Sequence, residues 1–211
     1  MRTPKTVKSL EELGRVQLSK TFFMRDFLYS EIAQVEQIPN IPDSPDLAIK
    51  AGSALCEKVL EPIQEKLGRI CIRSAYRSCA VNAKGAENKN QYSCSKNEAN
   101  YAGHIWDVKD ADGYMGATAC IVVTSFLPYY EKTADWQALA WWVHDNVPEY
   151  SSMYFFPKLA AFNISWHEKP EKRIDSYVQP KGCLTKTGMD NQNVDHSKAY
   201  QEFIRSIGAD K

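Results

Sequence analysis

The chain of 211 residues lacks the features of membrane-spanning and nucleic-acid-binding proteins. It contains no run of about 18 apolar residues, the length that a membrane-spanning helix needs. Its 26 lysine and arginine residues are balanced by 26 aspartate and glutamate residues, so no overall positive field attracts nucleic acid. We therefore expect neither a membrane span nor a nucleic-acid partner.

The six cysteines are even in number but follow neither a disulfide pattern nor a zinc-finger pattern. Residues 1–8 are basic, yet they lead into the polar segment Ser-Leu-Glu-Glu and not into the apolar stretch of a signal peptide. Without a secretion signal a disulfide framework is not expected, and without a Cys-x-x-Cys pair a zinc finger is not expected. A cytoplasmic, reduced protein is the simplest expectation, and export by a lysis or phage system stays open.

The apolar content is sufficient for a sizeable core, because 44% of the residues are hydrophobic and 11% are aromatic. The length suits one domain, or one domain with extensions. An aromatic cluster is interpreted as core and not as a sugar-binding platform: Trp141, Trp142, Tyr154, Phe155, Phe156 and Phe162. Nothing in the sequence indicates the oligomeric state.

Hydrophobic periodicity predicts the order of helices and strands. Apolar residues three or four apart predict helices over residues 25–35, 46–67, 135–145 and 197–207. Pro62 predicts a kink or a restart within the second of these helices. Runs of β-branched and aromatic residues predict strands over 70–74, 152–156 and 161–168. Residues 118–125 fit either a buried strand or a helix, and residues 176–189 are expected to be irregular.

The residues that can carry chemistry lie beyond the strand predicted at 70–74. Gly103 leads into a second apolar run that carries His104 and Asp107, and His167 ends the last predicted strand. Histidines and a carboxylate at strand ends, separated by a long loop, are typical of a metal or acid–base site. In the alternative interpretation His104 and Asp107 cap a strand and His167 is a hydrogen-bonded core residue.

Other polar residues are assigned to structure. Asp110 and Asp112 lack the ligand alternation and closing glutamate of an EF-hand and are interpreted as a turn. His144 and Asp145 end a predicted helix, where they are interpreted as a dipole-complementing histidine with a cap. His196 lies in the polar tail and is expected at the surface.

Two neighbouring segments stand out, Val-Leu-Glu-Pro-Ile-Gln-Glu-Lys-Leu-Gly at 59–68 and Ile-Arg-Ser-Ala-Tyr-Arg-Ser-x-x-x-Asn at 72–82. They resemble the D-alanyl-D-alanine zinc peptidases, a family of carboxypeptidases, dipeptidases and phage endolysins that shares its fold with the hedgehog signalling domain. The resemblance implies an α+β fold, with helices packed on a small antiparallel sheet. It divides the chain into an N-terminal extension (1–21), a peptidase-like domain (22–175) and a C-terminal extension packed on that domain (176–211).

The resemblance also implies a zinc site. When Gly103 is set on the glycine of the family pattern Ser-x-His-x-x-Gly-x-Ala-x-Asp, Asp107 falls on the aspartate ligand and His167 on the second histidine ligand. Asn100 occupies the first histidine position, where a neutral amide is a poor zinc ligand, so His104 is the candidate for the third ligand. In a regular strand His104 and Asp107 point to opposite faces, so this ligand set requires a bulge at Gly103.

Two catalytic roles follow from the same resemblance. Arg77 falls on the arginine that contacts the scissile or terminal carbonyl group in some of these enzymes. Ile164 occupies the position of the general base and cannot transfer a proton, so Glu168 or Asp110 is the candidate base.

The sequence thus supports two hypotheses. In the first, zinc held by His104, Asp107 and His167 activates water to hydrolyse a peptidoglycan-type peptide, with Arg77 and Glu168 in the catalytic roles. In the second, the domain keeps the fold and cleft without catalysis and binds a peptide, glycan or protein partner. A structural or assembly role in a phage or prophage is a further possibility. For the site, we expect the side chains of Arg77, Asp107 and His167 to converge in one cleft.

Overall fold

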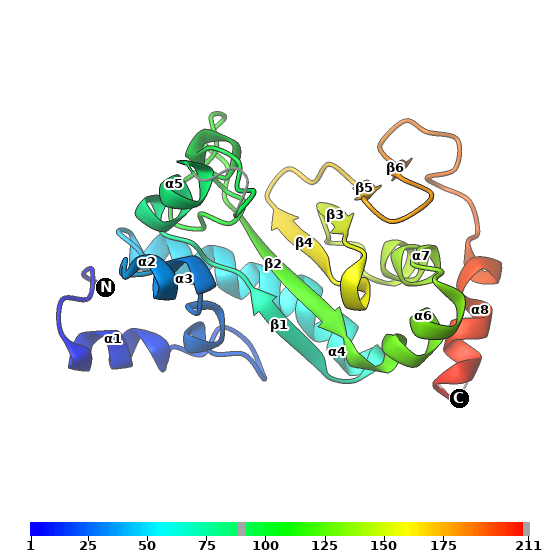
Figure 1. Cartoon of the computed structure of the whole chain (residues 1–211), viewed down its shortest axis with the longest axis horizontal. Coiled ribbons are helices and arrows are strands. Elements are labelled where there is room, and N and C mark those ends of the chain that lie inside the picture. Colours follow the sequence, from blue (N-terminus) through cyan, green and yellow to red (C-terminus); the bar gives the residue numbers. More distant parts are fainter. Residues whose placement is uncertain (88–91, 209–211) are drawn as a thin grey trace.

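The structure is a computed structural model that describes residues 1–87 and 92–208, and it is built around one β-sheet (Figure 1). Over the described residues the sheet has six strands in the order β1-β2-β4-β3-β5-β6. The strands are β1 Ile70–Ser74, β2 Gly116–Val123, β3 Ser152–Phe155, β4 Phe162–His167, β5 Arg173–Ser176 and β6 Gly182–Thr185. Helices pack around this sheet, so the predicted α+β class is confirmed.

The sheet is mixed and not antiparallel as expected, because β3 and β5 run parallel. The other neighbouring strands pair antiparallel. The ambiguous segment 118–125 is largely strand, since β2 lies between β1 and β4 and hydrogen-bonds to both. The expectation of an irregular 176–189 segment is wrong for β6, which is ordered by pairing with β5, a distant partner that local sequence does not reveal.

Alternate side chains divide the central strands into an apolar face and a polar face. The apolar face is buried in the core and carries Ala117, Ala119 and Ile121 of β2, Met153 and Phe155 of β3, and Phe162, Ile164 and Trp166 of β4. Helix α3 contacts this part of the sheet (Figure 1). The residues between them, among them Thr118, Asn163 and Ser165, therefore face the opposite side.

The helix predicted over 46–67 is confirmed, with an interruption before Pro62. It comprises α3 (Pro45–Leu55), a π-helical turn (Cys56–Leu60) and α4 (Glu61–Leu67). Pro62 lies in the first turn of α4, where a missing N–H is tolerated. Gly52 permits close packing of α3 on the sheet side, because a Cβ there would lie 2.7 Å from Cζ3 of Trp106.

Helices α6 (Leu127–Thr133), α7 (Gln137–Asn146) and α8 (Ser197–Ser206) form a second group at the C-terminal end of the molecule (Figure 1). The helices predicted over 135–145 and 197–207 are thereby confirmed. Phe203 of α8 is fully buried, with its ring centroid 4.8 Å from that of Phe126. In the described ranges no helix has the length and apolarity needed to cross a membrane.

The single helix predicted over 25–35 is wrong. The segment forms a 3₁₀ turn (Met24–Phe27) and a separate helix α2 (Glu31–Glu36). Ser30 separates them, because its extended backbone and side-chain hydroxyl cap the N-terminus of α2. Val35, expected on the apolar face, is 65% exposed. Helix α1 spans Val7–Gly14, and helix α5 spans Cys79–Glu87.

Candidate functional site

The polar face of the sheet carries a depression of about 360 Å³, which we call the sheet-face depression. Alternate residues of β2, β3 and β4 contribute to it: Thr118, Ser152, Tyr154, Asn163, Ser165 and His167. The segment 99–104, Asp110, Ser151 and Glu171 complete the lining. The predicted residues Asn100, His104 and His167 therefore lie together in one concave surface.

The sheet residues of the depression are mostly neutral hydrogen-bonding groups. The Ser165 hydroxyl lies 2.7 Å from that of Ser152 and accepts the Ser152 N–H at 3.0 Å. Burial, with a contribution from neighbouring Tyr177, raises the pKa of Tyr154 to about 12, so its phenol is neutral near pH 7. Neutral hydroxyls and amides both donate and accept, and a concave surface lined by them suits a polar ligand.

His104 lies in this lining as a neutral imidazole with a defined tautomer. Its Nδ1 is 2.7 Å from the Ala75 carbonyl oxygen, which can only accept, so Nδ1 carries the proton. Burial, and then the charge of Arg77, lower the pKa of His104 from 6.5 to about 3. The ring also hydrogen-bonds to the Asn163 side chain. Nε2 is thus the ring atom with a lone pair, the form in which histidine binds a metal or accepts a proton.

His167 forms a second polar centre with Asp110. The His167 Nε2 lies 3.1 Å from Asp110 Oδ2, and its Nδ1 contacts the backbone of Lys169. Asp110 Oδ1 accepts the N–H groups of Asp112 and Tyr114 at 3.0 and 2.8 Å, which confirms the predicted turn. The Tyr114 hydrogen bond is the largest influence that lowers the pKa of Asp110, and nearby His167 adds to it.

His104 and His167 occupy different parts of the depression. His104 contacts Asn163, and Asn163 is four residues from His167 on the same face of β4. At about 3.3 Å per residue, the Cα atoms of Asn163 and His167 are roughly 13 Å apart. Over the described residues, the predicted ligands His104, Asp107 and His167 are not among the groups whose ligand atoms come within 4.8 Å of one another.

Asp107 lies outside the lining of the depression. Its Oδ2 accepts the N–H groups of Asp43 and Ser44 at 2.8 and 3.3 Å, and its Oδ1 accepts the Tyr76 hydroxyl at 3.1 Å. Burial raises the pKa of Asp107, while these hydrogen bonds act in the opposite direction. Because Ser44 is the N-cap of α3, the carboxylate anchors the start of that helix. The structure therefore does not bring Asp107 into the depression with His167.

The remaining predicted residues are held by other contacts. Arg77 donates from Nη1 to the Cys94 sulfur at 2.6 Å, and burial lowers the pKa of its guanidinium. The Asn100 side chain donates to the carbonyl oxygens of Ser95 and Lys96. Glu168, the candidate base, accepts the N–H of Met115 at 2.7 Å through Oε2. Asn100 alone among these three lines the depression.

The strand expected to carry His104 and Asp107 is instead a tight turn. The Asn100 carbonyl accepts the N–H groups of Gly103 and Ile105 at 2.9 and 3.0 Å. The strand-face argument therefore does not apply, and His104 lines the same depression as His167. The turn packs closely on Gly116, where a Cβ would lie only 2.1 Å from the Ala102 carbonyl oxygen.

The segment 72–82 organises this turn and the loop before it. Tyr76 donates to Asp107, and Arg77 donates its backbone N–H to the His104 carbonyl at 2.8 Å. Asn82 is fully buried and donates to Ser95 and Asn97 at 3.0 and 2.9 Å. The segment thus positions His104 through its backbone and side-chain contacts.

A second group of potential ligands lies at the end of α7 and just before α8. The ligand atoms of His144, Asp145 and His196 all lie within 4.8 Å of one another, an arrangement that can hold a metal ion. His196 is buried and not at the surface as expected, because its ring stacks on Trp141 with a centroid distance of 3.7 Å. The sequence offered no signal for this group, since 51 positions separate Asp145 from His196.

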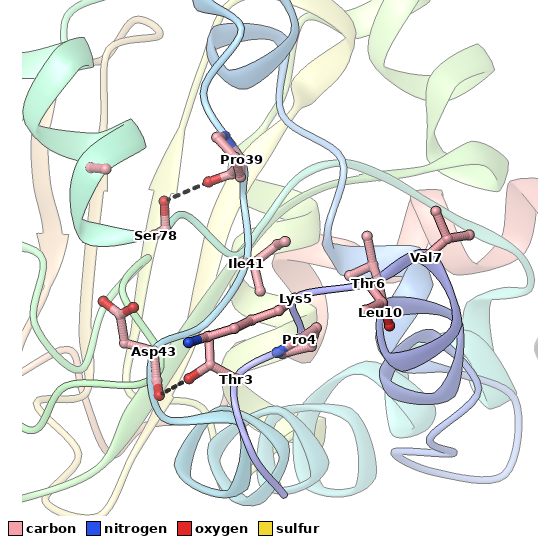
Figure 2. A pocket seen from close by; sticks show the side chains of 11 residues that line it. Thr3, Pro4, Lys5, Thr6, Val7, Leu10, Pro39, Ile41, Asp43 and Ser78 are labelled. Atoms are coloured by element: carbon pink, nitrogen blue, oxygen red, sulfur yellow. Dashed lines mark hydrogen bonds between the residues drawn. The ribbon is translucent and has the colours of Figure 1, made fainter.

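A larger hollow of about 600 Å³ lies between the N-terminal segment and the segment 39–43 (Figure 2). Its lining includes Pro4, Val7, Leu10 and Ile41, with Thr3 donating to the Asp43 carbonyl across one edge. None of the residues expected to bind metal or catalyse lies in this hollow. Its apolar lining has no cluster of catalytic groups, so the sheet-face depression is the better candidate site.

Comparison of the chain with models of protein families, with curated proteins and with solved structures gave no match. The assignment of function therefore depends on the residues and geometry of the site. One signal in the sequence marks the depression: Asn163, Ser165 and His167 alternate with apolar residues along the predicted strand. This period of two places them on one face, opposite the core.

Proposed function

We propose that the protein is a zinc-peptidase-like, hedgehog-like α+β domain that binds a peptidoglycan-type peptide in the sheet-face depression without cleaving it. The observation that carries this proposal is the role of Asp107. Its carboxylate is committed to Asp43, Ser44 and Tyr76, while the depression keeps its neutral hydrogen-bonding side chains. A polar concave surface without the expected ligand Asp107 is suited to binding.

The chemistry of the lining supports a peptide ligand. A peptide offers alternating amide donors and acceptors, which match the hydroxyl and amide groups of Thr118, Tyr154 and Asn163. His167 and Asp110 add an imidazole and a carboxylate to the lining, where a terminal or side-chain amine of the ligand can approach the carboxylate. Ile164, at the family's base position, belongs to the core and cannot activate water.

The test uses soluble stem peptides released from peptidoglycan. Calorimetry measures their binding, and mass spectrometry measures their cleavage. We expect saturable binding and recovery of intact peptide, with or without added zinc. Tyr154→Phe and Thr118→Val each remove one hydroxyl and are expected to raise Kd about two- to tenfold, the equivalent of one hydrogen bond. Thr133→Val, on α6 outside the lining, is the matched control. Equal affinity in all four proteins would contradict the proposal.

A metal-dependent hydrolase is the second candidate, and one observation favours it. The His104 tautomer, with Nδ1–H on the Ala75 carbonyl, is the form that presents Nε2 to a metal ion. In this case zinc would bind in the depression with His104 or His167 as ligands, and the peptide would be cleaved. Near-stoichiometric zinc in the untagged protein, lost in His167→Ala together with peptide cleavage, would establish this candidate and exclude simple binding.

A further inference from the structure

We infer that His144, Asp145 and His196 form a binding site for a divalent transition metal ion of the zinc class, which joins helix α7 to the segment preceding α8. This site is separate from the sheet-face depression and does not depend on the function proposed for it. His144 and Asp145 are in the last turn of α7, and His196 immediately precedes α8 (Figure 1).

The two histidine rings are oriented as metal-ligating rings are. His144 Nε2 lies 2.8 Å from the Gln192 carbonyl oxygen, and His196 Nε2 lies 2.8 Å from the Asn191 carbonyl oxygen. Because a carbonyl only accepts, each Nε2 carries a proton, and the Nδ1 of His144 can accept from the Tyr150 hydroxyl or bind an ion. The Nδ1 of His196 faces the Asp145 carboxylate, and any proton shared there would be released when an ion binds. Donation of the distal N–H to a backbone carbonyl is the usual support of a histidine ligand, because it fixes the tautomer and the ring orientation.

The Nδ1 atoms face oxygen groups that a metal ion can replace or share. His196 Nδ1 lies 2.8 Å from Asp145 Oδ1, and His144 Nδ1 lies 2.5 Å from the Tyr150 hydroxyl. Two ligand atoms on one zinc ion are at most about 4 Å apart, because each bond is about 2 Å long. The atoms of this group already lie within 4.8 Å, so small side-chain rotations are enough to close the set.

The surroundings hold the ligand side chains in place and leave the site accessible to an ion. The side chain of His196 is 6% exposed and is held flat against Trp141 at an interplanar angle of 7°. The side chain of Asp145 is 22% exposed, so an ion can enter and a water molecule can supply a fourth ligand. Two imidazoles and one carboxylate suit zinc better than calcium or magnesium, which prefer oxygen ligands.

The experiment is a calorimetric titration of the untagged, metal-free full chain with zinc chloride. A parallel titration with cobalt(II) in place of zinc monitors the absorption of the bound ion. We expect one ion per chain. Asp145→Asn keeps the size of a partly exposed side chain and removes a ligand. Removal of a residue that only supports a metal ligand lowers metal affinity about 10–100-fold. The zinc affinity of Asp145→Asn should fall by more than this, because the substitution removes a ligand itself. Asp190→Asn makes the same charge change at an exposed position of the preceding loop and should bind as the wild type does.

Nuclear magnetic resonance of the histidine rings gives a second readout of zinc binding. Zinc should shift the ring nitrogen resonances of two histidines, and His144→Gln should remove one of them together with binding. Absence of zinc binding would show that the group is only an ion pair with hydrogen bonds and would overturn the inference. Binding that survives Asp145→Asn but is lost in His167→Ala would also overturn it, because the ion would then lie in the sheet-face depression.

Discussion

Two buried polar side chains, His104 and Asp107, lie in or near the depression in opposite electrostatic environments. His104 must be neutral, since it faces the charge of Arg77 in a buried position, whereas Asp107 is surrounded by three hydrogen-bond donors. Each of these side chains supports a separate prediction about stability.

The first prediction concerns pH. The pKa of His104 is about 3 in the folded chain and 6.5 when unperturbed, so between these values the unfolded chain binds a proton that the folded chain does not. This contribution to stability is complete above pH 6.5 and is lost as the pH falls toward 3, by up to about 1.4 kcal/mol per pH unit. Urea denaturation of wild type and His104→Asn across this range should show a flatter profile for the variant. Parallel profiles would refute the prediction.

The second prediction separates a structural role of Asp107 from a metal-binding role. Asp107→Ala removes the acceptor for two N–H groups and one hydroxyl, and unsatisfied buried groups cost about 1–3 kcal/mol each. We expect the free energy of unfolding to fall by about 2–5 kcal/mol, because local relaxation lets water satisfy some of these groups. Asp112→Ala, an exposed carboxylate in the neighbouring turn, should change it by less than about 0.5 kcal/mol. A stable Asp107→Ala protein would argue for a functional carboxylate.

At the scale of elements, the turn at 100–104 depends on a glycine in the strand beneath it. The Ala102 carbonyl approaches Gly116 so closely that Gly116→Ala would place a Cβ 2.1 Å from that oxygen and 2.7 Å from Cδ2 of His167. We expect a displaced turn, weaker peptide binding, and destabilisation of about 1–3 kcal/mol in thermal or urea unfolding.

Gly14→Ala is the matched control for that variant. A Cβ at Gly14 would lie 3.3 Å from the Cβ of Arg25, a far smaller overlap than at Gly116, and no positive φ opposes the change. Equal effects of the two substitutions would show that the turn does not depend on the space above Gly116.

At the scale of the whole molecule, both terminal segments are joined to the central part by buried contacts. Glu61 of α4 accepts hydrogen bonds from Ser19 and Thr21 at 2.7 Å each, which attaches the N-terminal segment. Phe203 attaches α8 through a buried contact with Phe126. We therefore expect the terminal segments to unfold together with the sheet.

Phe203→Ala tests this cooperativity. Loss of a fully buried phenylalanine ring should lower the free energy of unfolding by about 3–5 kcal/mol, measured by urea denaturation in a single transition. Glu202→Ala, at an exposed position of the same helix, should leave it nearly unchanged. Two separate transitions in the wild type would show that α8 is an independent unit.

Local sequence was sufficient where the signal lies within one element. The strand 70–74 and the helices at 46–67 and 135–145 were predicted because their apolar residues repeat with the period of the element. The segment 25–35 was mispredicted because Ser30 competes with the helical pattern by capping a new helix. Strand β6 was missed because it is defined by pairing with β5.

The sequence by itself determined several helices and strands, much of the core and the stretch that carries His104, since burial patterns are local and periodic, and the α+β class followed from the family resemblance. Only the tertiary structure decided which polar residues share a site. It commits Asp107 to α3, joins His104 and His167 in one depression at different positions, and brings His196 to His144 and Asp145. The physical reason is that hydrogen bonds and metal ligation depend on distances of a few ångströms between residues far apart in the chain, which no local pattern encodes.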